Sequence, residues 1–226
     1  MAEVQESAGE SIAPRRSRTL QLEQVAGAKS ATPLVSVVTP FYNSADTLAR
    51  CIESVLAQSC GDFEYILADN CSTDGSGEIA GAFAQRDNRI RYMHCAQHLP
   101  QIPNYNRALR QISPQAAYCK LVQADDLIYP ACLEKMTGLA MANPSIGLVS
   151  AVRRVNDVLE VFPAAVIRDA VMSGREVCRG TLEDRFFAFG SMTTVMYRAD
   201  LVRARPDFYN IETPFPDTDV ACDLLL

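Results

Sequence analysis

The chain has 226 residues, of which 48% are hydrophobic and 21% charged, and 27 acidic against 21 basic residues leave a formal net charge of −6. This length and apolar content can supply an ordinary globular core, which excludes disorder throughout. The acidic surplus disfavours nonspecific binding to nucleic acid, because its field repels phosphates and the only basic cluster, at residues 15–18, is small. We therefore expect no nucleic-acid partner.

The apolar runs are too short to cross a bilayer. Residues 34–38 and 146–150 are among the longest, whereas a spanning helix needs roughly 18 or more residues. We expect no integral membrane segment, and peripheral association stays open. The first 20 residues lack the apolar core of a secretory signal, so export is not expected.

Eight cysteines are spread along the chain without a C-x-x-C pair or zinc-like spacing. Cys51 and Cys132 fall on apolar helix faces and Cys119 in an apolar strand. We interpret them as buried, reduced thiols, which predicts a cytoplasmic location.

Residues 1–30 are polar and without periodicity, and we expect a disordered tail there. From residue 33, short apolar β-branched runs alternate with helical patterns, which is typical of a parallel sheet covered by helices. Strands are predicted at residues 34–39, 63–68, 90–93 and 117–122. Helices are predicted at 44–58, around 79–83, at 103–112 with Pro103 in the first position, and from Pro130 to a break at Asn143.

The last third is less regular. A strand is predicted at 146–152, a hairpin within 155–168, a helix at 175–189, an extended segment at 193–197 and a final helix from 218. One α/β domain over residues 31–226 accounts for these elements.

Carboxylates follow two of the strands and precede the last helix. In open α/β sheets, ligands bind outside the carboxyl ends of the strands. The candidate acids there are Asp69, Asp74, Asp125, Asp126, Asp217 and Asp219. Adjacent carboxylates such as Asp125 and Asp126 suit a divalent cation beside a phosphate.

Most of these acids also have an ordinary structural explanation, whereas Asp69 directly ends a buried strand, where its carboxylate could bind a base or ribose. Asp126 and Asp74 could cap helices, and acids at 217 and 219 suit the positive end of a helix dipole. Other chemistries lack their motifs: the chain has no G-x-S-x-G elbow, no G-x-x-x-x-G-K-[ST] loop and no G-x-G-x-x-G turn. A hydrolase triad, a P-loop NTPase and a Rossmann dehydrogenase are therefore excluded.

Four segments occur in the order VSVVTPFYNSADTLARCIESVLAQS, FEYILADNCSTDGS, NYNRAL and CKLVQADDLIYPACLE. Together they resemble the inverting glycosyltransferases of family 2, closely over residues 33–146 and more loosely through FGSMTTVMYR to PFPDTDV. The resemblance implies the GT-A fold, a single Rossmann-like α/β domain with a mostly parallel central sheet flanked by helices.

The resemblance also implies which residues bind the donor. The loop after the first strand would hold the nucleoside, Asp69 the base, and Arg107 the diphosphate through its guanidinium fork. The implied donor-binding set is Thr39, Pro40, Tyr42, Asn43, Asp69, Asn70, Asp74, Asn104, Asn106, Arg107, Gln123, Ala124 and Asp125.

Two motif positions depart from the family. The metal motif often reads Asp, any residue, Asp, and here begins with Gln123, so Asp125 and Asp126 are the implied ligands of Mg²⁺ or Mn²⁺. Asp217 stands at the position of the catalytic base, with Pro216 in place of the usual acid before it and Asp219 as the second candidate.

The expected reaction transfers a sugar from a nucleotide-diphosphate donor, a UDP-sugar in the first instance, to a hydroxyl of a glycan, lipid-linked or other acceptor, with inversion and metal assistance. A degenerate GT-A domain that binds a nucleotide sugar or a partner without turnover is the alternative. A nucleotidyltransferase would need a Gly-rich, basic first loop, which TPFYNSAD lacks. Because Leu226 falls inside a predicted helix, a truncated or minimal domain is expected.

Overall fold

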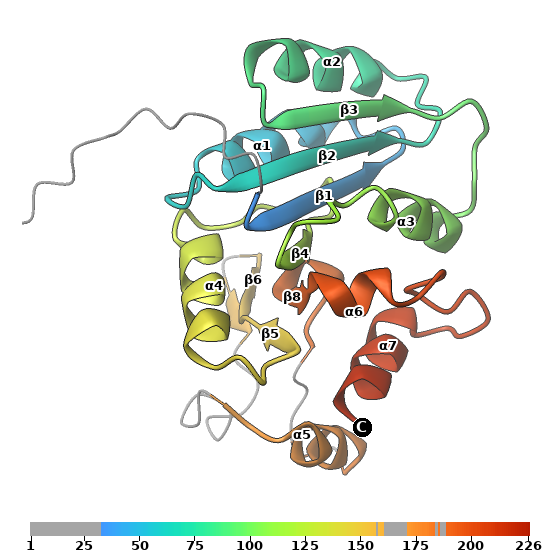
Figure 1. Ribbon diagram of the computed structural model, residues 1–226. Helices are drawn as coiled ribbons and strands as arrows, with labels where there is room; N and C mark the ends of the chain where they lie inside the picture. The colour runs from blue at the N-terminus through green and yellow to red at the C-terminus, as the bar shows by residue number, and fades with distance from the viewer. Residues whose placement is uncertain (1–32, 157, 161–170, 184, 186–188) are drawn as a thin grey trace, which may run out of the picture.

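The computed structural model describes residues 33–156, 158–160, 171–183, 185 and 189–226. Its centre is a six-stranded sheet with the order β3-β2-β1-β4-β8-β5 (Figure 1). The strands are β1 Val35–Phe41, β2 Phe63–Asp69, β3 Ile90–His94, β4 Tyr118–Leu121, β5 Leu148–Ser150 and β8 Val195–Arg198. Neighbours among β1 to β4 are parallel, and β8 runs antiparallel to β4 and β5. The predicted mostly parallel sheet is confirmed.

Helices cover both faces of this sheet. Those on one face are α1 Ala45–Leu56, α2 Ser76–Arg86 and α4 Cys132–Ala142, and those on the other are α3 Gln101–Leu109, α6 Ala199–Arg203 and α7 Pro216–Leu225. The strands alternate between the two cores: Val37 packs with α1, and Val38 packs with α3. Burial on both faces explains why the strands read as continuous apolar runs.

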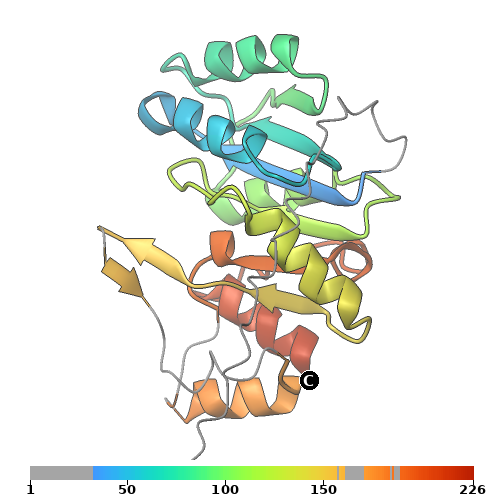
Figure 2. The same ribbon diagram turned by 90° about the vertical axis from the view of Figure 1, so that its left-hand side faces the viewer.

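Helix α5, Gly174–Leu182, packs against α7. It lies at the end of the molecule opposite α2 in both views (Figures 1 and 2). A separate hairpin, β6 Arg153–Val155 with β7 Val158–Glu160, projects from the side of the molecule. The hairpin was predicted within residues 155–168. Strand β7 lies inside that range, β6 begins two residues before it, and residues 161–168 lie outside the described part of the chain.

Strand β1 continues through Pro40, where the prediction ended it. Val38 accepts a backbone hydrogen bond from Val122 of the β4 side, and Phe41 accepts one from Asn70 of the β2 side. Because strand residues alternate in direction, the missing N–H of Pro40 faces the β4 side, where the registered pairing has already ended at Val38 and Leu121. The proline thus ends one ladder without ending the strand.

Three further boundaries differ from the predictions. Helix α3 begins at Gln101, so Pro103 is its third residue, a position tolerated because first-turn N–H groups lack helical partners. The extended segment predicted at 193–197 begins only at Val195, as β8, because residues 192–194 form a 3₁₀ turn in which the Thr194 hydroxyl accepts from the backbone N–H of Ser191. The helix α6 was not predicted.

The predicted tail at residues 1–30 lies outside the described residues. The helix predicted at 175–189 is shorter than expected, because α5 ends at Leu182 with Glu183 as its C-cap. Within the part of the chain that the structure describes, no helix is long and apolar enough to cross a membrane. All eight cysteines are free, and Cys51 and Cys119 are buried as predicted. Cys132, also predicted to be buried, is only half-buried, because it is the first residue of α4 and lies at the end of the helix.

Candidate functional site

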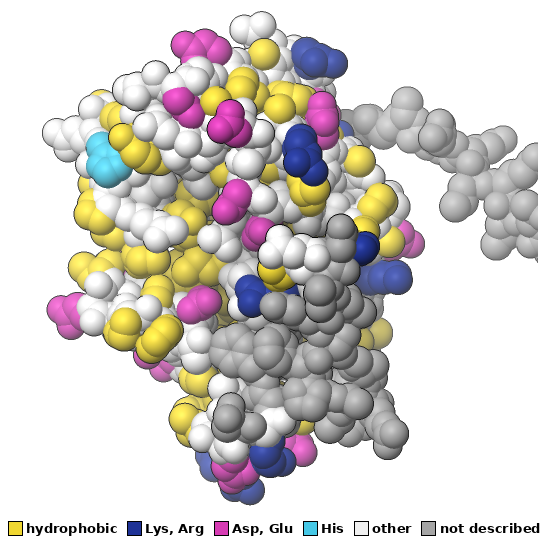
Figure 3. All heavy atoms as spheres, turned by 180° about the vertical axis from the view of Figure 1, so that it is seen from behind, with side chains coloured by type: hydrophobic (Ala, Val, Ile, Leu, Met, Phe, Trp, Pro, Cys, Tyr) yellow, Lys and Arg dark blue, Asp and Glu magenta, His cyan; other side chains and the backbone are white. Residues whose placement is uncertain are grey.

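A cavity of about 540 Å³ opens at the carboxyl ends of β1, β2 and β4. Ligand pockets in proteins commonly measure roughly 300 to 1,000 Å³. On the side of the molecule to which these strands point, hydrophobic side chains gather in a hollow with a histidine at its upper rim (Figure 3). The predicted donor-site residues that line the cavity are Pro40, Tyr42, Asn43, Asn70, Asn104, Gln123, Ala124 and Asp125.

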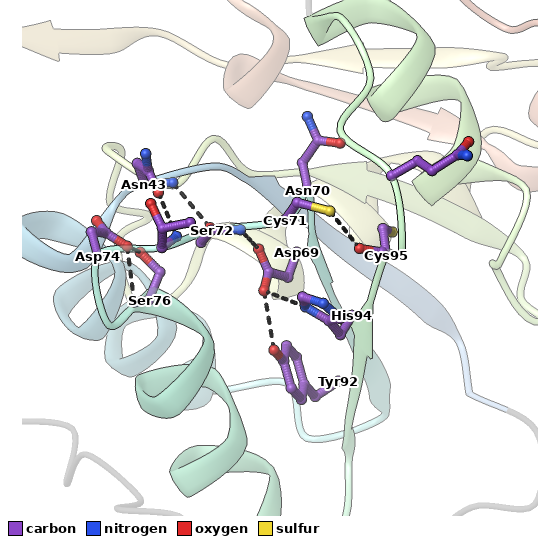
Figure 4. Close-up of polar contacts among 12 residues, drawn as sticks. Asn43, Asp69, Asn70, Cys71, Ser72, Asp74, Ser76, Tyr92, His94 and Cys95 are labelled. Carbon is purple, nitrogen blue, oxygen red and sulfur yellow. Dashed lines mark hydrogen bonds and ion pairs between the residues drawn. The ribbon is translucent and has the colours of Figure 1, made fainter.

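The loops after β1 and β2 are joined by a row of polar contacts (Figure 4). Asn43, in the left-handed region with φ 47°, accepts a bond from Thr73 N through its side-chain oxygen at 2.8 Å. Asp74 accepts from Ala45 N at 2.9 Å and from Ser76 N at 3.0 Å. These bonds lower the pKa of Asp74, with the Ser76 hydroxyl the largest cause and Ala45 N the next. Asp74 therefore caps both α1 and α2 and does not line the cavity.

Asp69 ends β2 and points away from the cavity, toward β3 (Figure 4). Asp69 is only 1% exposed. Its carboxylate accepts hydrogen bonds from Ser72 N at 2.8 Å and from the Tyr92 hydroxyl at 3.1 Å, and it lies 3.0 Å from His94 Nδ1. Burial alone would raise the pKa of Asp69, but the bonds from Ser72, His94 and Tyr92 outweigh it and lower the pKa. The structure thus places Asp69 as an anchor of the loop behind the cavity wall, and its contact with a base stays a prediction.

Asn70, the residue after β2, hydrogen-bonds the backbone of Leu99, which lines another wall of the cavity. Its amide donates to Leu99 O at 2.7 Å and accepts from Leu99 N at 3.0 Å. The same oxygen accepts from Arg107 at 3.1 Å, and Arg107 also donates to Asn104 at 2.5 Å. Arg107 does not line the cavity but braces two amides that do.

The segment QADD forms a tight turn at the end of β4, closed by Asp126 N donating to Gln123 O at 3.0 Å. Gln123 N donates to the hydroxyl of Thr193 at 3.0 Å, so the turn is tied to the segment before β8. Asp125 is exposed and lines the cavity, whereas Asp126 is half-buried and does not.

This donor set fits a divalent cation only in part. Among the described residues, no group of three or more acidic, histidine or cysteine side chains could hold a metal ion. Mg²⁺ and Mn²⁺ nevertheless bind through one or two carboxylates together with phosphate oxygens and water. Asp125, with Asp126 beside it, meets that smaller requirement.

The remaining predicted residues lie apart from the cavity lining. Thr39 is buried, with its hydroxyl 2.9 Å from that of Tyr65. Asn106 is buried against a later segment of the chain. Asp217 and Asp219 lie in the first turn of α7, where Asp217 accepts from Thr218 N at 2.9 Å. Of these described residues, none is among those that line the cavity.

Sequence reasoning missed one wall of the cavity. His98, Leu99, Gln101 and Tyr105 line it from the segment after β3 and from α3. His98 packs edge-on against Tyr42, with ring centroids 4.5 Å apart. Tyr105 lies within the segment NYNRAL, but His98 and Leu99 belong to no motif, so only their place between β3 and α3 could have drawn attention to them.

A polar cavity over the carboxyl ends of parallel strands is the arrangement by which open α/β sheets bind their ligands. The family model described as Glycosyl transferase family 2 matches residues 36–198. The chain therefore belongs to glycosyltransferase family 2, and the predicted family is confirmed.

Two relatives and two solved structures define the similarity. The chain is 35% identical over 103 residues to the glycosyltransferase GlyG of Streptococcus pneumoniae serotype 4, covering 46% of this chain and 34% of that protein. It is 30% identical over 166 residues to the putative glycosyltransferase EpsE of Bacillus subtilis, covering 71% and 59%. The chain thus spans less than two thirds of the length of these relatives.

The fold is that of GT-A glycosyltransferases. The S. aureus TarS fragment 1–349 in complex with UDP superposes with a TM-score of 0.66 at 18% identity, covering 84% of this chain and 54% of that one. The mannosyltransferase PcManGT from Pyrobaculum calidifontis, in complex with GDP-Man and Mn²⁺, superposes with a TM-score of 0.65 at 19% identity, covering 89% and 54%.

Proposed function

We propose that this family 2 glycosyltransferase takes a sugar from a nucleoside-diphosphate donor and transfers it, with inversion, to an acceptor hydroxyl. The observation that carries the proposal is the cavity itself, which joins Asn70, Asn104 and Asp125 at one sheet edge. The related structures hold UDP, UDP-GlcNAc or GDP-Man. A UDP-sugar is the first donor to test, and the free thiols support a reducing, cytoplasmic setting within the same proposal.

The chemistry assigned to this chain follows from its side chains. Asn43, Asn70 and Asn104 offer amide groups to the nucleotide, and Asp217 takes the proton of the acceptor hydroxyl as its oxygen attacks the anomeric carbon. The bond from that carbon to the diphosphate breaks, and the diphosphate leaves with the electron pair. A divalent cation bound at Asp125 and Asp126 would neutralise negative charge on the leaving diphosphate.

A donor screen that measures release of nucleoside diphosphate tests the proposal. Calorimetric titration with UDP and GDP, with and without Mn²⁺, then reports how binding depends on the metal. We expect the metal-dependent part of binding to be lost in Asp125→Ala and kept in Asp62→Ala, an exposed acid at the opposite, amino end of β2. The anomeric configuration of the product, read by NMR, tests inversion.

A binding module without turnover is the second candidate. It is favoured by Gln123 at the first metal position and by the placing of Asp217 outside the cavity lining. Metal-independent binding without sugar release would support this alternative. Failure to bind any nucleoside diphosphate would contradict both functions.

A further inference from the structure

Asn106 of α3 faces away from the donor cavity. It is 1% exposed, although its helical neighbours Asn104 and Tyr105 line the cavity. Its side-chain nitrogen donates to Tyr209 O at 2.7 Å, and its side-chain oxygen accepts from Tyr209 N at 2.8 Å. Both polar groups of one amide thus hold the backbone of a single residue that lies 103 positions later in the chain.

Tyr209, the residue that Asn106 holds, belongs to a buried core that includes residues of α7. Its fully buried ring packs edge-on against Phe208 at 5.0 Å and shares a core with Val220 and Ala221 of α7. Seven residues separate it from Asp217. The position of α7 therefore depends on where Tyr209 is held.

The carboxylate of Asp217 is an electrostatic neighbour of this cluster. Burial raises the pKa of Tyr197, and the negative charge of Asp217 is the next largest cause. Asp217 also contributes to the raised pKa of Tyr209, after burial and other neighbours. The hydroxyls of Tyr197 and Tyr209 are buried and have no hydrogen-bond partner among the described residues.

We propose that Asn106 is a positioning residue for the catalytic base: it fixes Tyr209, and through Tyr209 the first turn of α7 with Asp217. This inference rests on the proposed function. It replaces the donor contact expected for Asn106 and gives α3 two roles. Asn104 faces the donor, while Asn106 sets the place of the base on the opposite side of the helix.

Asn106→Ala removes both bonds to Tyr209 and leaves the cavity lining intact. We expect kcat for donor turnover to fall at least tenfold, while KM for the donor and Kd for the nucleoside diphosphate stay within twofold. Asn104→Ala should give the opposite pattern, with weaker binding of the nucleoside diphosphate. Both variants are measured in the 226-residue chain with saturating acceptor, or with water as acceptor.

Arg203→Ala is the matched control for a general loss of stability. Arg203 also joins distant backbone, donating to Ser113 O and Ala116 O at 3.1 Å each, but it does so near the amino end of β4. We expect it to lower the melting temperature and to leave kcat unchanged at temperatures where the protein is folded. An equal fall in kcat at an equal loss of stability would overturn the positioning role.

Two other results separate this inference from the proposed function. If Asn106→Ala weakens nucleoside-diphosphate binding and keeps kcat at saturation, Asn106 is a donor contact and only this inference fails. If the wild-type chain neither binds a nucleoside diphosphate nor turns over a donor, the proposed function fails and the inference fails with it.

Discussion

Asp69 illustrates how a residue at a predicted binding position can also serve the fold. Its carboxylate is satisfied by three protein groups, from Ser72, Tyr92 and His94. An acceptor with this many partners is costly to remove, because each buried donor left behind loses its hydrogen bond. Its main effect should therefore be on stability.

We expect Asp69→Asn to destabilise the protein by about 1–3 kcal/mol at neutral pH. Because the folded protein holds the pKa of Asp69 below its ordinary value of 3.8, this stability is present above pH 3.8 and is lost as pH falls through the folded pKa. Urea unfolding of wild type and variant from pH 6 downward measures the difference. Asp62→Asn serves as the exposed control, and a difference that stays constant with pH would contradict the assignment.

Lys120 is the second residue whose burial has a measurable consequence. It is fully buried in β4, and its ammonium donates to Val195 O at 3.3 Å and to Thr193 O. Burial lowers its pKa to about 8 from 10.5, although nearby Cys132, Asp126 and Cys119 act in the opposite direction. The folded state therefore binds fewer protons than the unfolded state between these two pH values.

Because of this difference, raising the pH should stabilise wild type relative to Lys120→Met. We expect a relative gain of roughly 3 kcal/mol between pH 8 and pH 10.5, at 1.36 kcal/mol for each pKa unit. Comparing the two proteins at each pH cancels the titration of the shared groups that do not interact with Lys120. Lys135→Met, on the exposed side of α4, should show no such trend, and a flat difference for Lys120 would refute the prediction.

The sequence predicted which residues lie near the site, but it could not predict which of their side chains point into the cavity. Asn104 and Asn106 are two positions apart on α3, and the residue types are the same, yet one lines the cavity and the other binds Tyr209. The partner of Asn106 lies in a turn-rich segment without a periodic pattern. Nothing local in NYNRAL could reveal a contact across 103 positions.

At the level of elements, the sequence predicted the first half of the domain well. Strands β1 and β2 are almost completely buried and mostly apolar, and α1 places Leu48, Cys51, Ile52 and Val55 on one buried stripe. The extended segment predicted at 193–197 is confirmed from Val195, where β8 begins, but starts two residues too early. The β-branched Thr193 and Thr194 suggest a strand, whereas the Thr194 hydroxyl bonds back to the local backbone in a 3₁₀ turn.

The packing of α5 against α7 depends on one glycine. A Cβ added at Gly174 would collide with the backbone carbonyl of Leu225. We expect Gly174→Ala to destabilise the protein by about 1–3 kcal/mol, because overpacking forces the two helices apart. Thermal or urea unfolding measures the effect.

Gly81→Ala provides the matched control within a helix. An added Cβ at Gly81 meets nothing within 4 Å, so alanine should stabilise α2 by about 0.5–1 kcal/mol through its better helix propensity. If Gly174→Ala lowers the free energy of unfolding and Gly81→Ala raises it, the close approach of α5 and α7 is established. The same sign in both would contradict it.

At the scale of the whole molecule, the cavity and the predicted base belong to different parts of the chain. The lining comes from residues 40–125, and Asp217 comes from the last helix. Several long-range hydrogen bonds join the first part of the domain to residues after 190, among them Gln123 with Thr193 and Asn106 with Tyr209. Their long sequence separation explains why the relation of the base to the cavity could not be derived from motifs alone.

No disulfide cross-links these parts, since all eight cysteines are free. Burial raises the pKa of Cys51 to about 11 and of Cys119 to about 12, so both thiols are protonated as well as inaccessible at pH 8. Cys60 is only half-buried, at the surface end of its loop. Native packing, rather than cysteine chemistry, should therefore decide which thiols react.

We expect iodoacetamide at pH 8 to alkylate Cys60 at least about 100-fold faster than Cys51 or Cys119, because the reagent can reach Cys60, whereas Cys51 and Cys119 are buried and protonated. Mass spectrometry of peptides after timed labelling measures each rate, and the same labelling in urea should remove the difference. The melting temperature should be the same with and without reductant, since no disulfide contributes to stability. Labelling of Cys51 or Cys119 in the native protein at the rate of Cys60 would show that the two cores open far more readily than their complete burial implies.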